Sequence, residues 1–108
     1  MEITPQQSGI LKRLKDGGFG IAAFPMYADY IGVRKGNCAA LLAPDPNGGF
    51  RLFGAPSYLL GDNFSARVGQ NGHSWFVWKQ NKLEATPERI AELDAFSAEL
   101  SDALLQRA

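Results

Sequence analysis

Thr4-Pro5-Gln6-Gln7 and Thr86-Pro87-Glu88-Arg89 are the two stretches that decide the fold. In each, the threonine hydroxyl can accept a hydrogen bond from a free backbone N–H of the first helical turn, and proline at the first helical position loses no hydrogen bond. Gln7 follows Thr4 by three residues, which is the spacing of a capping box. The pattern predicts helices over residues 5–16 and 87–106, the first ended by Gly17-Gly18.

Between these helices, short apolar runs alternate with turns rich in glycine and proline, as in an antiparallel meander. Asn71-Gly72 is the clearest turn, because this pair suits a two-residue hairpin. Residues 56–62 are interpreted as irregular or as a short edge segment. The expected strands are 19–24, 30–34, 38–43, 50–54, 64–68, 74–79 and 83–85.

These elements predict a single α+β domain over residues 1–108, with a two-layer arrangement of helices and sheet. The expected order is an N-terminal helix, an antiparallel β-meander of about five to seven strands, and a C-terminal helix. Both helices would lie on one face of the sheet. The strand at residues 74–79 is apolar on both faces, since Trp75 and Val77 alternate with Phe76 and Trp78. It is therefore covered on both sides, or covered on one side and used for binding on the other.

The composition limits the classes of partner that the chain is expected to bind. Eleven basic and eleven acidic residues give a formal net charge of zero, which argues against strong nonspecific attraction to nucleic acid or to an anionic membrane. Cys38 is the only cysteine, so no internal disulfide can form, and a cytoplasmic location is expected. No apolar segment is long enough to span a bilayer.

The sequence offers little for metal or nucleophilic chemistry. With one histidine and one cysteine, a structural zinc site within one chain is nearly excluded, and no cofactor is expected. The acidic residues of the last helix could hold a divalent ion weakly, but a solvated helix face explains them better. Cys38 is interpreted as a small buried hydrophobe and His73 as an exposed turn residue, so a Cys38–His73 catalytic pair is a distant possibility.

Two loops and one strand end supply the candidate binding surface. Tyrosine and methionine around residues 25–30 offer adaptable contact area, unless the tyrosines fold back on the sheet. The segment 54–62 carries large side chains in a predicted loop, either as a lid over the open sheet or as an exposed patch. The candidate surface residues are Met26, Tyr27, Tyr30, Arg34, Tyr58, Leu59, Trp78 and Lys79.

The leading hypothesis is a small binding module without catalysis, which uses the open sheet face and these loops to hold a protein partner or a second copy of itself. The alternative is a small-molecule or nucleotide-binding domain, with or without enzymatic activity, that has a cleft between sheet and loops. In that cleft Arg34, Arg67, Lys79 or Tyr58 would contact an anionic or polar ligand. Weak binding of single-stranded nucleic acid ranks third. No motif in the chain carries a family signature.

Overall fold

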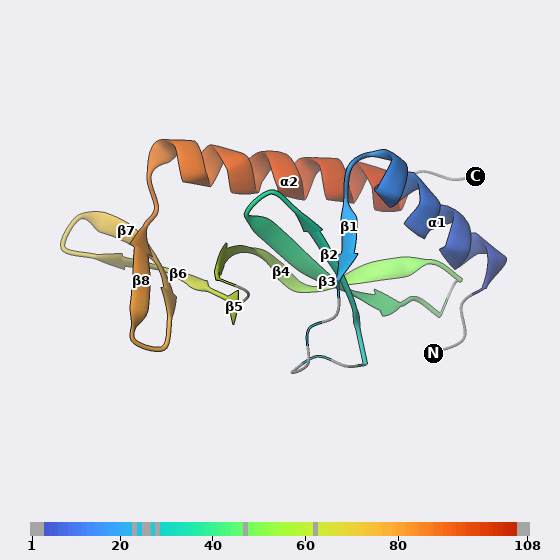
Figure 1. The fold of residues 1–108 in the computed structure, drawn as a ribbon, viewed down its shortest axis with the longest axis horizontal. Helices are drawn as coiled ribbons and strands as arrows, with labels where there is room; N and C mark the ends of the chain where they lie inside the picture. Colours follow the sequence, from blue (N-terminus) through green and yellow to red (C-terminus); the bar gives the residue numbers. More distant parts are fainter. Residues whose placement is uncertain are drawn as a thin grey trace.

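The computed structural model describes residues 4–22, 24, 27, 29–46, 48–61 and 63–105, and it confirms the predicted α+β class. Over these described residues, one helix near each end brackets eight antiparallel strands (Figure 1). The helices are α1 (Pro5–Asp16) and α2 (Pro87–Leu105). The strands are β1 (Gly20–Ala22), β2 (Ile31–Lys35), β3 (Cys38–Pro44), β4 (Phe50–Leu60), β5 (Asn63–Phe64), β6 (Ala66–Gln70), β7 (His73–Trp78) and β8 (Asn81–Glu84).

Both predicted helix starts are present. Thr4 accepts a hydrogen bond from the Gln7 backbone N–H (3.1 Å), and the Gln7 side chain accepts one from the Thr4 N–H (3.0 Å), which completes the capping box. The Arg89 N–H donates to the Thr86 hydroxyl at 3.3 Å. Gln7 is also buried and donates to the Gly49 carbonyl, so the first cap fastens α1 to the loop before β4.

The strands form two sheets, whereas the sequence pattern predicted one. The first sheet has the order β1-β2-β3-β4-β5 and the second has the order β6-β7-β8. The pairing of β4 with β5 stops after two residue pairs, and the Ser65 hydroxyl then donates to the Tyr58 carbonyl. This side-chain bond lies where the next residue pair of the ladder would come, and from there the chain continues into β6 of the second sheet.

Residues 56–62 also differ from the prediction, because β4 continues to Leu60 and the segment is mostly strand. Ala39 pairs with Ser57 and Leu41 pairs with Phe53, so three residues of β4 lie opposite Ala40 alone. The bulge explains the mistake. Gly54, with φ +74°, and Pro56 are turn residues in sequence, but here they form an irregularity within one long strand.

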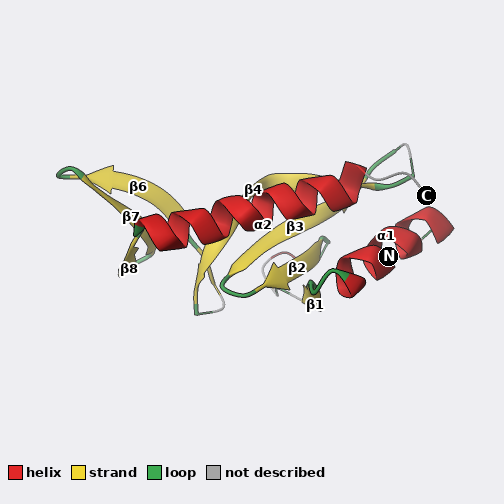
Figure 2. Ribbon diagram, turned by 90° about the horizontal axis from the view of Figure 1, so that it is seen from above, coloured by secondary structure: helices red, strands yellow, loops and turns green. Residues whose placement is uncertain are grey.

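The molecule is elongated, with extents of 48 × 25 × 21 Å, and α2 runs along most of it (Figures 1 and 2). The second sheet lies near the N-terminal end of α2, and α1 lies near its C-terminal end. One core cluster joins all the layers. Its fully buried members include Leu14 of α1, Leu42 of β3, Phe76 of β7 and Leu100 of α2.

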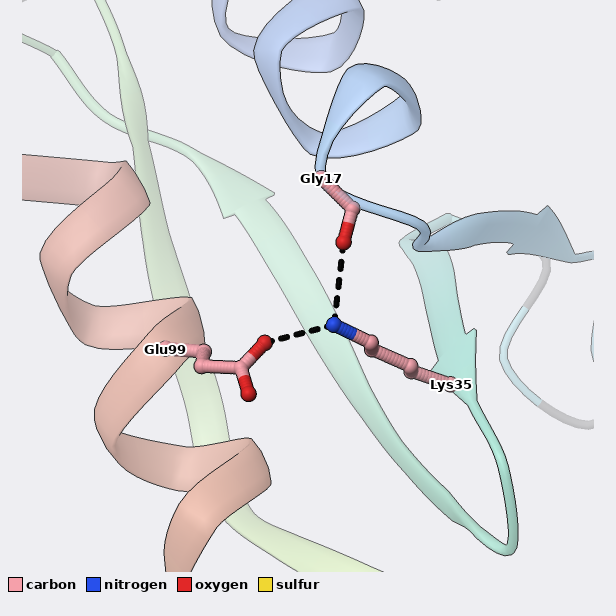
Figure 3. A network of polar contacts seen from close by, with 3 residues as sticks. All are labelled: Gly17, Lys35 and Glu99. Carbon is pink, nitrogen blue, oxygen red and sulfur yellow. Dashed lines mark hydrogen bonds and ion pairs between the residues drawn. The ribbon is translucent and has the colours of Figure 1, made fainter.

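Two acidic residues of α2 bond to the β2–β3 hairpin. The Lys35 ammonium lies 2.6 Å from Glu99 and donates to the Gly17 carbonyl at 2.9 Å, which links β2 to both helices (Figure 3). The Asn37 backbone N–H donates to Glu92 at 3.0 Å. These two carboxylates therefore contact the hairpin, which the solvated-face interpretation of the acidic residues did not anticipate.

Candidate functional site

An open groove lies where the two sheets meet, and its volume is about 430 Å³. One wall comes from the bulged part of β4 and the other from the ends of β6 and β7. Leu41 of β3 and Tyr27 complete the surface. The lining residues are Tyr27, Leu41, Phe53, Gly54, Ala55, Ser57, Phe64, Ser65, Ala66, Val77, Trp78 and Lys79. We call this feature the junction groove.

The β4 wall presents an aromatic side chain to solvent. Phe53 is 45% exposed, although it lies next to buried Leu41 across the β3–β4 ladder. Its ring stacks on Tyr30 with centroids 4.2 Å apart and an angle of 18° between the planes. Because Tyr30 packs against one side of the Phe53 ring, the ring is held in place while its other side stays accessible for binding.

Aromatic residues before β2 cover the neighbouring sheet surface. The ring of Phe24 meets Phe64 edge-on at 4.9 Å, and Tyr27 lies 5.6 Å from the same ring. The tyrosines therefore fold back on the sheet, which was one of the two alternatives for this segment. Tyr27 still lines the groove, so folding back and forming a surface are compatible here.

The β7 wall combines an indole with the groove's charge. The Lys79 ammonium lies 4.7 Å from the centroid of the Trp78 ring, a cation–π distance. Lys79 has φ +54° at the start of the β7–β8 turn, a left-handed backbone conformation at the point where the chain reverses direction after Trp78. Of the groove-lining residues, Lys79 is the one charged at neutral pH, so the groove is apolar with a cationic edge.

The structure brings some of the predicted site residues together and separates others. Tyr27, Trp78 and Lys79 line the groove, and Tyr30 supports Phe53 beside it. Arg34 is half-buried in β2 and does not line the groove. Met26 lies outside the described residues.

Tyr58 and Leu59 were predicted as surface residues, but each is only 6% exposed. Tyr58 points into the core, where its ring stacks on Phe76 at 4.7 Å. Burial raises the pKa of the Tyr58 hydroxyl, and nearby Glu92 adds to this increase. Tyr58 therefore stabilises the contact between the sheets, and neither buried residue offers a docking surface.

Sequence reasoning missed Phe53, Leu41, Phe64 and Val77 as groove residues. Each belongs to an apolar strand run, and alternation alone does not show which side chains the two-sheet arrangement leaves uncovered. The one available signal was Gly54-Ala55-Pro56 directly after Phe53, since such residues inside a strand pattern indicate a bulge.

The residues with nucleophilic or metal-binding chemistry are not assembled. Cys38 is fully buried, and burial raises the pKa of its thiol to about 11, so it stays protonated at neutral pH. His73 lies in the second sheet with its side chain 63% exposed, 4.0 Å from Glu84. Within the described part of the chain, no three His, Cys, Asp or Glu side chains are grouped to hold a metal ion.

Comparison with known protein families, curated proteins and solved structures found no match to this chain. Neither helix, over the residues described, is both long and apolar enough to cross a membrane.

Proposed function

We propose that this chain is a binding module without catalysis, which holds an apolar segment of a partner protein in the junction groove. The observation that carries the proposal is Phe53, a large aromatic side chain that is supported by Tyr30 yet 45% exposed at the groove wall. Aromatic anchors of this kind supply much of the binding energy at protein interfaces.

The form of the groove favours a protein segment over a small molecule. Phe53, Gly54, Ala55, Ala66 and Lys79 are all exposed, so the walls are shallow and open to solvent. Small-molecule sites usually enclose most of their ligand. Lys79 at the edge favours a segment with an acidic residue beside its apolar side chains.

The absence of an assembled catalytic group among the described residues supports binding over catalysis. Cys38 is buried and protonated, and His73 is exposed on the other sheet. A cytoplasmic location stays a prediction from the single cysteine.

A displayed library of random peptides, selected on the wild-type chain, tests the proposal. Selected peptides should bind Phe53→Asp at least about tenfold more weakly than wild type, because the charge removes the apolar anchor. The matched control is Ile21→Asp, since Ile21 is similarly exposed (40%) but lies on β1, outside the groove. If no peptide is enriched, or if peptides bind both variants equally well, the proposal fails.

A second candidate is a small-molecule or nucleotide site in the same groove, because about 430 Å³ falls within the usual size of ligand pockets. A thermal-shift panel of metabolites and nucleotides distinguishes it from the first. A compound that stabilises wild type and Ile21→Asp but not Phe53→Asp would favour this candidate.

A further inference from the structure

The two sheets expose several strand edges, and most of them are protected against pairing with another chain. The edge strands β1 and β5 are short, with three and two residues respectively. The strand β4 is distorted by the bulge in its ladder with β3 and contains Pro56, and β8 has two charged residues among four. Short length, proline, bulges and charges are the usual ways in which proteins prevent pairing at strand edges.

The strand β6 lacks these protections. It has five residues with one charge, no proline, and an uninterrupted register with β7. It is the outer strand of its sheet, and residues 66–69 are all exposed. Val68 at its centre is 42% exposed. An unprotected edge of this length can accept another strand along its free backbone groups.

The face of the second sheet that carries Val68 is apolar along β6 and β7, while Lys82 and Glu84 of β8 lie on the same face beyond them. Val68 pairs with Trp75, and Ala66 pairs with Val77, so these four side chains share one face. The opposite face carries Phe76, which is buried in the core. The strand β7, whose sequence is apolar on both faces, is thus covered on the face that carries Phe76. On its other face Trp75 is only partly buried.

We propose that β6 pairs antiparallel with β6 of a second copy of this chain, around a two-fold axis through Val68. The two second sheets then form one six-stranded sheet, in the order β8-β7-β6 followed by the partner's β6-β7-β8. This inference does not depend on what occupies the junction groove.

The sequence of β6 favours a second copy as the occupant. Antiparallel pairing of identical strands satisfies a two-fold axis, so one edge is complementary to itself. With the axis through Val68, the two valines face each other and Arg67, the strand's one charge, lies opposite Gly69 of the partner subunit. An axis through Arg67 would oppose two like charges. The zero net charge of the chain adds no repulsion between copies.

Cross-linking through an introduced cysteine tests both the dimer and its register. Residues directly opposite in an antiparallel pair lie about 4.5–5.5 Å apart at Cα, which suits a disulfide. Val68→Cys should therefore form a disulfide dimer rapidly when oxidised glutathione is added. Ala66→Cys is the control on the same strand and face, because two copies of this residue would lie about 13 Å apart. Native Cys38 is fully buried and does not compete.

Sedimentation measurements over a dilution series supply the second test. Wild type should show a concentration-dependent dimer, and Val68→Lys should raise the dimer dissociation constant about tenfold or more, because it sets two like charges on the axis. Ile21→Lys, at the other sheet's edge, should leave dimerisation unchanged. A monomer at every concentration, or equal cross-linking rates for the two cysteine variants, would overturn the proposal.

Discussion

At the scale of single residues, Gly32 shows how closely the face away from the helices is packed. A Cβ atom at this position would lie 2.4 Å from the Phe24 ring and 2.6 Å from the Ala22 carbonyl oxygen. Glycine is thus required in β2 because the aromatic ring rests directly on the backbone. This contact places Phe24 against Phe64, one of the residues that line the junction groove.

Gly32→Ala should lower the free energy of unfolding by about 1–3 kcal/mol, because the ring or the β1 backbone must move. Urea denaturation measures the change. Gly20→Ala is the matched control, since the nearest atom to its Cβ would be the Arg34 carbonyl oxygen at 3.6 Å, an ordinary contact. Equal stability of the two variants would show that Phe24 does not rest on Gly32 in solution.

Cys38 predicts how stability changes with pH. Its pKa rises from 9.0 to about 11 in the folded chain, through burial and then the Glu92 carboxylate. The folded state therefore keeps a proton that the unfolded state loses above pH 9. The stabilisation is complete below pH 9 and is lost as the pH rises towards 11, by an amount on the order of 2–3 kcal/mol.

Urea unfolding between neutral pH and pH 11 measures this loss in wild type and in Cys38→Ala. The alanine variant should lose less stability over the same range. Tyr58 also has a raised pKa, to which Cys38 contributes, so the difference between the two curves reports the thiol together with its effect on Tyr58. Identical pH dependence of the two proteins would contradict the assignment.

At the scale of elements, the contact between α2 and the β2–β3 hairpin depends on two carboxylates of different importance. Glu92 is half-buried and accepts a hydrogen bond from the Asn37 backbone N–H. Glu99 forms an ion pair with Lys35, in which the Glu99 side chain is 51% exposed and the Lys35 side chain 38% exposed. Hydrogen bonds to charged groups contribute more than exposed ion pairs do. We therefore expect Glu92 to hold the hairpin turn more strongly than Glu99.

Glu92→Ala should destabilise the chain by about 1–2 kcal/mol, and Glu99→Ala by less than about 1 kcal/mol. Thermal and urea denaturation measure both, and Asp94→Ala, an exposed acid on the same helix, provides the baseline. Raised salt should reduce the effect of Glu99→Ala more than that of Glu92→Ala. The reverse order of the two losses would show that the ion pair holds the hairpin.

At the scale of the whole molecule, α2 and one aromatic stack join the two sheets. Phe76 of β7 is 1% exposed and stacks on Tyr58 of β4 with the ring planes 8° apart. Because the chain leaves the first sheet after β5, at Ser65, no backbone ladder connects the sheets among the described strands. Their relative position, and with it the junction groove, depends on side-chain packing.

Phe76→Ala should cost about 3–5 kcal/mol, because it empties the contact between the sheets. Hydrogen exchange should show a larger loss of protection in β6–β8 than in β2 and β3, since the second sheet has few other attachments. Phe76→Leu keeps most of the volume and should cost less. Uniform loss of protection across both sheets would show that they unfold as one unit.

Local signals were enough for the helices and for most strands. Thr4 and Thr86 act through bonds within a single helical turn, so the sequence predicted both helix starts. Asn71 and Gly72 have φ of 53° and 78°, as the predicted hairpin turn requires. Residues 54–62 were misinterpreted because a bulge uses the same residue types as a loop, and only its pairing with β3 distinguishes the two.

The sequence by itself therefore determined the α+β class, the order of elements, the helix caps and the tight turns, since each depends on residues close together in the chain. The tertiary structure alone decided the division into two sheets, the burial of Tyr58 and Leu59, and the assembly of Phe53, Trp78 and Lys79 around one groove. These features depend on which apolar faces meet across long separations in sequence. Alternation shows that a face is apolar, but packing decides what covers it.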